Sequence, residues 1–106
     1  MTDLDRRVAE LRGWTLDEAL HCWVDTDGVL LAGSATYSPE TNLLHAYQLW
    51  DEARSEGWCL WVIQGDGNVW QVGRKLRDQA YHAKFVSFPD LPRAITQAWV
   101  EAMGAP

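Results

Sequence analysis

Two Asp-Gly pairs, each flanked by apolar runs, constrain the fold more than any other feature of this sequence. The first pair, at 27–28, lies within residues 21–32, and the second, at 66–67, lies within residues 58–72. Asp-Gly favours a type I′ turn, because both central residues of that turn need positive φ. The pattern therefore predicts two antiparallel hairpins over these two segments.

Three helices are predicted from apolar residues that repeat at helical spacing. The first covers about 3–12 and begins at Thr2 and Asp5, which have the spacing of a capping box. The second covers about 42–56. The third covers about 91–103 and has the cleanest apolar stripe in the chain. These helices would supply the surface on which the strands pack.

One helical turn at 15–20 and a strand at about 81–88 complete the predicted elements. Their order is α-β-β-α-β-β-β-α, and the predicted fold is α/β (α+β): a mainly antiparallel sheet of about five strands, with helices packed on it as a sandwich. Residues 58–63 are apolar on both faces of a strand, which suggests cover on both sides of the sheet. A length of 106 residues without a linker predicts a single globular domain over 1–106.

The charge distribution narrows the class of partner. Residues 1–66 carry 12 acidic and 4 basic side chains, whereas residues 67–106 carry 3 acidic and 5 basic ones, for a net charge of −6. The acidic part repels phosphate, so duplex nucleic acid is not expected as a partner, but a small anion at the carboxy-terminal part stays open. No apolar run approaches the roughly 20 residues of a membrane span. With no signal peptide and two cysteines, the expected compartment is the cytoplasm.

No motif points to catalysis, a metal or a cofactor, and we expect none of the three. His21 and Cys22 are neighbours in a predicted strand, so their side chains point to opposite faces. The sequence has no Cys-x-x-Cys and no His-x-x-x-His. A disulfide between Cys22 and Cys59 would require their strands to be neighbours.

One set of residues could bind a planar anion such as a nucleotide. If residues 66–67 form a two-residue turn, Ile63 pairs with Trp70 and Arg74 faces His82, and alternate residues of three strands then share one face. Aromatic rings beside cations suit a base and a phosphate. The candidate ligand-binding residues are Trp61, Trp70, Arg74, Lys75, Arg77, His82 and Lys84. Alternatively, helices bury the aromatic rings of this face, and the cations lie at a solvent-exposed edge. A shift of the strand register by one residue would move these side chains to the opposite face of the sheet.

Short segments over nearly the whole chain are familiar as an ordered set. They are TDLDRRVAE at 2–10, GW at 13–14, WVDTDG at 23–28, YSPET at 37–41 with AYQLW at 46–50, GW at 57–58 and LPRAI at 91–95. Together they resemble the phage ABA sandwich domain family, small proteins of phages and prophages. The resemblance implies an α/β sandwich and a phage or prophage origin, but no reaction and no functional residues. Residues 15–21 depart from the family pattern.

Three classes of function stay open from the sequence. The first is a non-enzymatic phage accessory protein that inhibits host defence by capturing a host protein or a signalling nucleotide in the host cytoplasm. The second is a small hydrolase that uses His82 with a nearby acid or with Cys59. The third is a self-associating module, a homo-oligomer in which exposed tryptophans bury against a second copy.

Overall fold

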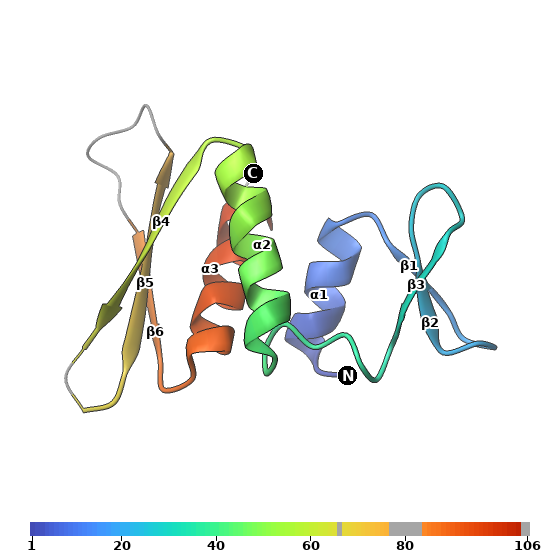
Figure 1. Ribbon diagram of the computed structural model, residues 1–106, viewed down its shortest axis with the longest axis horizontal. Helices are drawn as coiled ribbons and strands as arrows, with labels where there is room; N and C mark the ends of the chain where they lie inside the picture. The colour runs from blue at the N-terminus through green and yellow to red at the C-terminus, as the bar shows by residue number, and fades with distance from the viewer. Residues whose placement is uncertain (66, 77–83, 105–106) are drawn as a thin grey trace.

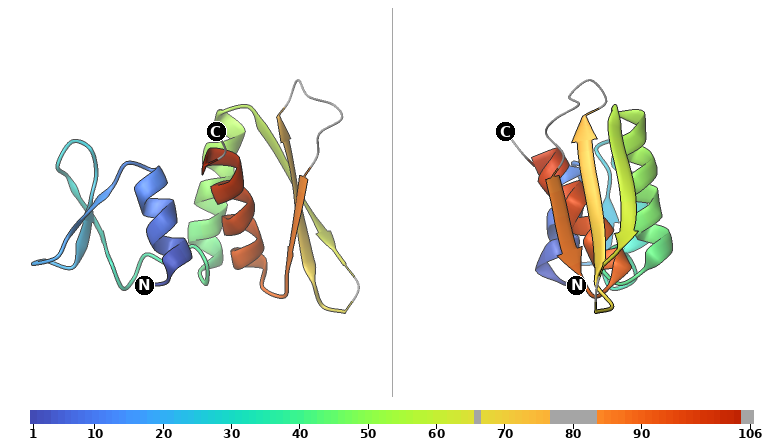
Figure 2. Two further views of the ribbon diagram at one scale, coloured as in Figure 1. Left: turned by 180° about the vertical axis from the view of Figure 1, so that it is seen from behind. Right: turned by 90° about the vertical axis from the view of Figure 1, so that its left-hand side faces the viewer.

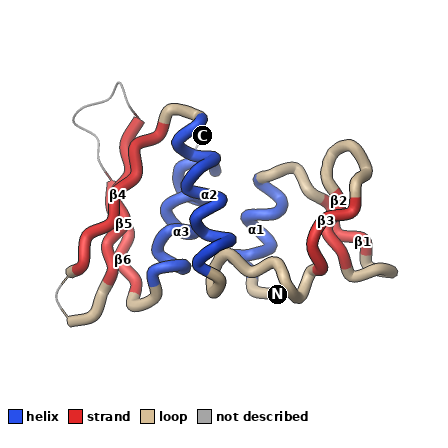
Figure 3. Tube along the Cα trace, in the orientation of Figure 1, coloured by secondary structure: helices blue, strands red, loops and turns tan. Residues whose placement is uncertain are grey.

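The computed structural model describes residues 1–65, 67–76 and 84–104. Its three helices form a layer between two three-stranded antiparallel sheets, which lie on opposite sides of the helices (Figure 1). Figure 3 separates these layers by colour. The fold is therefore α+β, as predicted. The predicted single sheet of about five strands is wrong, because each hairpin region packs against a different side of the helices and the strands form two sheets.

The helices agree with the prediction to within one residue at each end. They are α1 (Asp3–Leu11), α2 (Leu43–Ser55) and α3 (Leu91–Gly104). The backbone N–H of Asp5 donates to Thr2 Oγ1 at 3.1 Å, as expected for an N-cap. Asn42 caps α2 in the same way, with its side chain accepting from the N–H of His45 at 3.2 Å. None of the three is long and apolar enough to cross a membrane, which holds for the described part of the chain.

The first sheet has the strand order β1 (Thr15–Asp17), β2 (Cys22–Val24) and β3 (Leu30–Gly33). The predicted helical turn at 15–20 is therefore wrong. The carboxylate of Asp17 accepts from the N–H groups of Ala19 and Leu20, at 3.0 and 3.1 Å, and so closes a tight turn after β1. Pairing with β2 then outweighs the weak local preference for helix.

The second sheet has the strand order β4 (Trp58–Gln64), β5 (Trp70–Leu76) and β6 (Lys84–Phe88). Helices α2 and α3 cover one face of it, and the right-hand view of Figure 2 looks onto the opposite, outer face. Ile63 is 44% exposed and Phe85 is 52% exposed on that outer face. The expected cover on both sides is therefore wrong, since the first sheet packs on the far side of the helices instead.

Two apolar clusters hold the layers together. The first joins α1, α2 and α3 to the first sheet around Val8, Trp23 and Trp99. The second joins α2 and α3 to the second sheet around Val72 and Ile95. Alanines of α2 contribute to both clusters and alanines of α3 to the second, and their small side chains let helices and strands approach closely. The two central helices therefore carry apolar residues on both sides.

Candidate functional site

The loop between β4 and β5 is longer than the predicted two-residue turn. The N–H of Gly65 donates to the carbonyl of Val69 at 2.7 Å. Gly67 and Asn68 both have positive φ, at 68° and 63°, so the bend extends one residue past the Asp-Gly pair. Gln64 therefore pairs with Trp70, and the predicted pairing of Ile63 with Trp70 is wrong by one residue.

This change of register divides the predicted ligand-binding set between two faces. Trp70, Arg74 and Lys84 lie on the inner face toward the helices, where Arg74 pairs with Lys84 and not with the predicted His82. Trp61 and Lys75 lie on the outer face, because they alternate with the inner residues. The predicted single face of rings and cations is therefore wrong. Arg77 and His82, the other two members of the set, lie outside the described residues.

The cations of the inner face gather at the end of α3. Arg7 of α1, Arg74 of β5 and Lys84 of β6 line an open pocket of about 360 Å³, together with Val100, Glu101 and Gly104 of α3. We call these three cations and their pocket the basic pocket. The carboxyl end of a helix carries partial negative charge, which favours cations at this place.

Arg74 is the most unusual residue of the basic pocket. It is only 5% exposed, and its Nη1 has no hydrogen-bond partner among the residues that the structure describes. It forms an ion pair with Glu101, with 3.7 Å between Nη2 and Oε1, a distance that is too long for a hydrogen bond. A buried charge is normally both paired and hydrogen-bonded, since its desolvation is costly. The pocket therefore has a donor and a positive charge that the described residues satisfy only in part.

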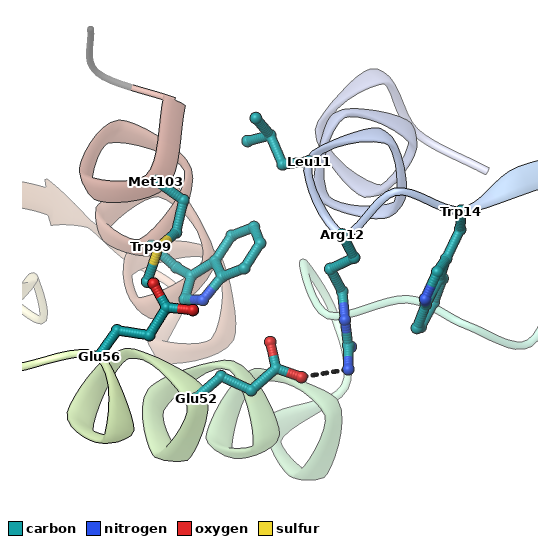
Figure 4. Close-up of a pocket in the computed structure, with 7 residues that line it drawn as sticks. All are labelled: Leu11, Arg12, Trp14, Glu52, Glu56, Trp99 and Met103. Carbon is teal, nitrogen blue, oxygen red and sulfur yellow. Dashed lines mark hydrogen bonds and ion pairs between the residues drawn. The ribbon is translucent and has the colours of Figure 1, made fainter. Parts of the chain in front are cut away.

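A second and larger pocket lies among the three helices. It has a volume of about 480 Å³ (Figure 4). We call it the three-helix pocket; its lining consists of Leu11, Arg12, Trp14, Glu52, Glu56, Trp99 and Met103. Sequence reasoning missed it, because these residues come from three separate segments and form no motif.

Arg12 organises one wall of the three-helix pocket. Its guanidinium forms an ion pair with Glu52, donates to the Tyr37 hydroxyl at 2.8 Å and lies 4.2 Å from the ring centroid of Trp14. Burial raises the pKa of Glu52 even though the positive charge of Arg12 lowers it. Burial likewise raises the pKa of Tyr37. The charge and the hydrogen-bond donors of Arg12 are thus used in contacts with other residues of the protein.

The described residues show no catalytic or metal-binding arrangement. They contain no group of three or more His, Cys, Asp or Glu side chains placed to hold a metal ion. Cys22 is in the first sheet and Cys59 in the second, and both thiols are free. His45 has a structural role, because its Nδ1 accepts from the N–H of Ser38 at 3.1 Å.

Comparisons with protein-family models, with curated proteins and with solved structures gave no match. The class that can be stated from the fold is therefore a small α+β protein with a helical layer between two sheets.

Proposed function

We propose that this chain is a non-enzymatic binding protein and that its basic pocket takes the phosphate group of a small anionic ligand. The observation that carries the proposal is Arg74, a buried guanidinium whose Nη1 has no partner in the described part of the chain. A ligand oxyanion would supply the acceptor that Nη1 lacks, and it would add a second negative charge to that of Glu101. Arg7 and Lys84 would add two further cations, against the single acid Glu101.

The chemistry of the pocket favours phosphate over a compact halide-like anion. A guanidinium presents several N–H groups in a fixed fork, which matches two phosphate oxygens, whereas Lys84 contributes a point charge. The nearest predicted ring on the same face is Trp70, four residues from Arg74 along β5, or about 13 Å at the usual strand rise. We therefore propose a binding site for the phosphate of a nucleotide, and we assign no aromatic residue to stack on its base.

The resemblance to phage proteins supplies a biological setting for this proposal. In a phage or prophage, a protein that captures a signalling nucleotide of the host would inhibit host defence. A captured host protein stays the alternative target in that setting. The basic pocket supports the nucleotide version, because a phosphate is the group that it is best equipped to hold.

Thermal unfolding with pyrophosphate and with a panel of linear and cyclic nucleotides tests the proposal. A ligand at about 100 times its Kd stabilises the folded state by about 2.7 kcal/mol, which for a domain of this size raises Tm by about 10 °C or more. We expect Lys84→Gln and Arg7→Gln to reduce that shift strongly. Lys75→Gln is the matched control, since Lys75 is on the opposite face of the same sheet.

Two results would count against the proposal. One is a flat response to the whole panel. The other is a shift that survives in both Lys84→Gln and Arg7→Gln, because binding would then lie elsewhere. Either result would turn the search toward a host protein.

Self-association is a second candidate function, favoured by the outer face of the second sheet. Ile63 and Phe85 are both about half exposed there, beside Trp61. A second copy that covered this face would bury all three. Light scattering across a range of concentrations measures the molar mass and so shows whether the protein forms dimers. If it does, a Phe85→Ser variant that is monomeric would show that the two copies meet at this face. The hydrolase alternative needs His82, which is outside the described residues, and no described residue adds support to it.

A further inference from the structure

The three-helix pocket has the size and the lining of a small-molecule site. Its volume of about 480 Å³ falls in the range usual for ligand pockets. Leu11, Trp14, Trp99 and Met103 give it apolar and aromatic surface. It shares no lining residue with the basic pocket, so the two pockets can bind different ligands.

The free charge of this pocket is negative. Arg12 and Glu52 neutralise each other in their ion pair. Glu56 also lines the pocket and has no ion-pair partner in the part of the chain that the structure describes. Acids alone would not define a site, because exposed carboxylates are ordinary on a helix surface.

The indole of Trp99 provides the independent observation. Trp99 is 3% exposed, and its Nε1 has no hydrogen-bond partner within residues 1–65, 67–76 and 84–104. Figure 4 shows the nitrogen edge of this indole facing the region between the carboxylates of Glu52 and Glu56. A buried N–H is costly without an acceptor, so the pocket lacks one acceptor as well as one positive charge.

We propose that the three-helix pocket binds an organic cation, an alkylguanidinium or alkylammonium group on an apolar body that also carries a carbonyl acceptor. The cation pairs with the exposed carboxylate of Glu56 through a charge-assisted hydrogen bond. The apolar body contacts Leu11 and Met103, and the carbonyl accepts from Trp99 Nε1. Arg12 keeps Glu52 and Trp14 in place.

The test compares two probes that differ only in charge. N-acetyl-arginine methylamide has the cation and the carbonyl, and N-acetyl-citrulline methylamide replaces the guanidinium with a neutral urea of the same shape. The chain has seven tryptophans, so its ¹H–¹⁵N spectrum has seven indole signals, and the Trp99→Phe variant identifies the signal of Trp99. We expect that signal to move with the arginine probe and to stay in place with the citrulline probe.

Variants at exposed positions keep the test independent of folding. We expect Glu56→Gln to weaken binding of the arginine probe about tenfold, as the loss of a charge-assisted hydrogen bond predicts. Glu18→Gln is the control, since Glu18 is exposed in the turn between β1 and β2 and away from the pocket. n-Butylguanidinium has the cation but no carbonyl, so we expect it to bind more weakly than the arginine probe. Equal affinity of the two would overturn the contact between a ligand carbonyl and Trp99 Nε1.

The proposal is overturned by any of three results. The Trp99 signal stays in place at millimolar arginine probe, or the citrulline probe moves it equally, or Glu56→Gln binds as tightly as the wild type. None of these depends on whether the basic pocket binds phosphate.

Discussion

The indole ring of Trp61 lies directly over Gly73. A Cβ at position 73 would fall 2.3 Å from Cε2 of that ring, far inside van der Waals contact. The ring also meets Phe85 edge-on, with 5.6 Å between the centroids and 81° between the planes. The absent side chain of Gly73, on the central strand of the second sheet, thus makes the space that Trp61 occupies on the outer face.

Gly73→Ala should therefore destabilise the protein by about 1–3 kcal/mol, because the added methyl group must displace the ring of Trp61. In a Trp61→Ala background the same change should cost less than about 0.5 kcal/mol, since nothing is then displaced. Urea unfolding of the four proteins in this cycle measures the difference. An equal cost in both backgrounds would show that the ring is not what Gly73 accommodates.

Asp5 should be one of the most sensitive polar positions in the chain. It is 1% exposed, and its carboxylate accepts from the Ser38 hydroxyl and from the N–H of Glu40, both at 2.9 Å. Asp5→Ala leaves both donors without this acceptor, and we expect a loss of about 3 kcal/mol in the free energy of unfolding. Asp3→Ala, an exposed change in the same helical turn, should cost at most about 1 kcal/mol. Similar losses for the two variants would contradict the bridging role of Asp5.

Glu52 should give the stability a distinctive pH dependence. Burial raises its pKa in the folded state above the usual value of 4.5, so the folded protein holds this proton more tightly than the unfolded chain does. Its contribution is therefore fully present below the unfolded-state pKa and is lost as pH rises through the folded-state pKa.

The variant Glu52→Gln cannot titrate at this position, so it isolates that contribution. The free energy of unfolding of the wild type, measured relative to the variant, should fall as pH rises upward from about 4.5. Urea unfolding at half-unit steps from pH 4 to about 7 covers the window. A constant difference would mean that the ion pair with Arg12 cancels the effect of burial, and a difference that grows with pH would mean that the ion pair outweighs burial.

Cys22 and Cys59 should resist forming a disulfide within one folded chain. They belong to sheets on opposite sides of the helical layer, and a disulfide needs Cα atoms within about 7 Å. After mild oxidation of dilute protein, we expect mass spectrometry of the unfolded monomer to find two thiols that react with iodoacetamide. A monomer that has lost two hydrogen atoms and takes up no label would refute the layer arrangement.

The sequence predicts the helices well and the strand pairing less well. Helix ends are encoded locally, by a cap such as Thr2 and by an apolar stripe, so each was placed to within one residue. The 66–68 region contains both Asp-Gly and Gly-Asn, and either pair could have formed the bend. The choice depends on the whole sheet: the observed register lines up Val62, Val72 and Val86 beneath the helices and leaves Gly73 under Trp61.

The same register explains why the candidate site was only partly predictable. Arg74 and Lys84 are direct cross-strand partners, so they lie on the same face in the observed register as they do in the predicted one. Trp61 moves to the other face, because side chains alternate along a strand. Arg7 joins the basic pocket from a helix nearly 70 positions away along the chain, a contact that no local pattern encodes.

Every strand pair among the described residues joins neighbours along the chain, so each sheet is a simple meander. During synthesis the first sheet can close against α1 while the rest of the protein is still being made. The second sheet differs, since Val72 and Val86 are covered by Ile95 and Ala98 of α3, which is synthesised after all three strands of that sheet. A nascent chain that reaches only to β6 therefore carries an apolar sheet that α2 alone covers, and until α3 emerges this sheet is open to aggregation with other chains.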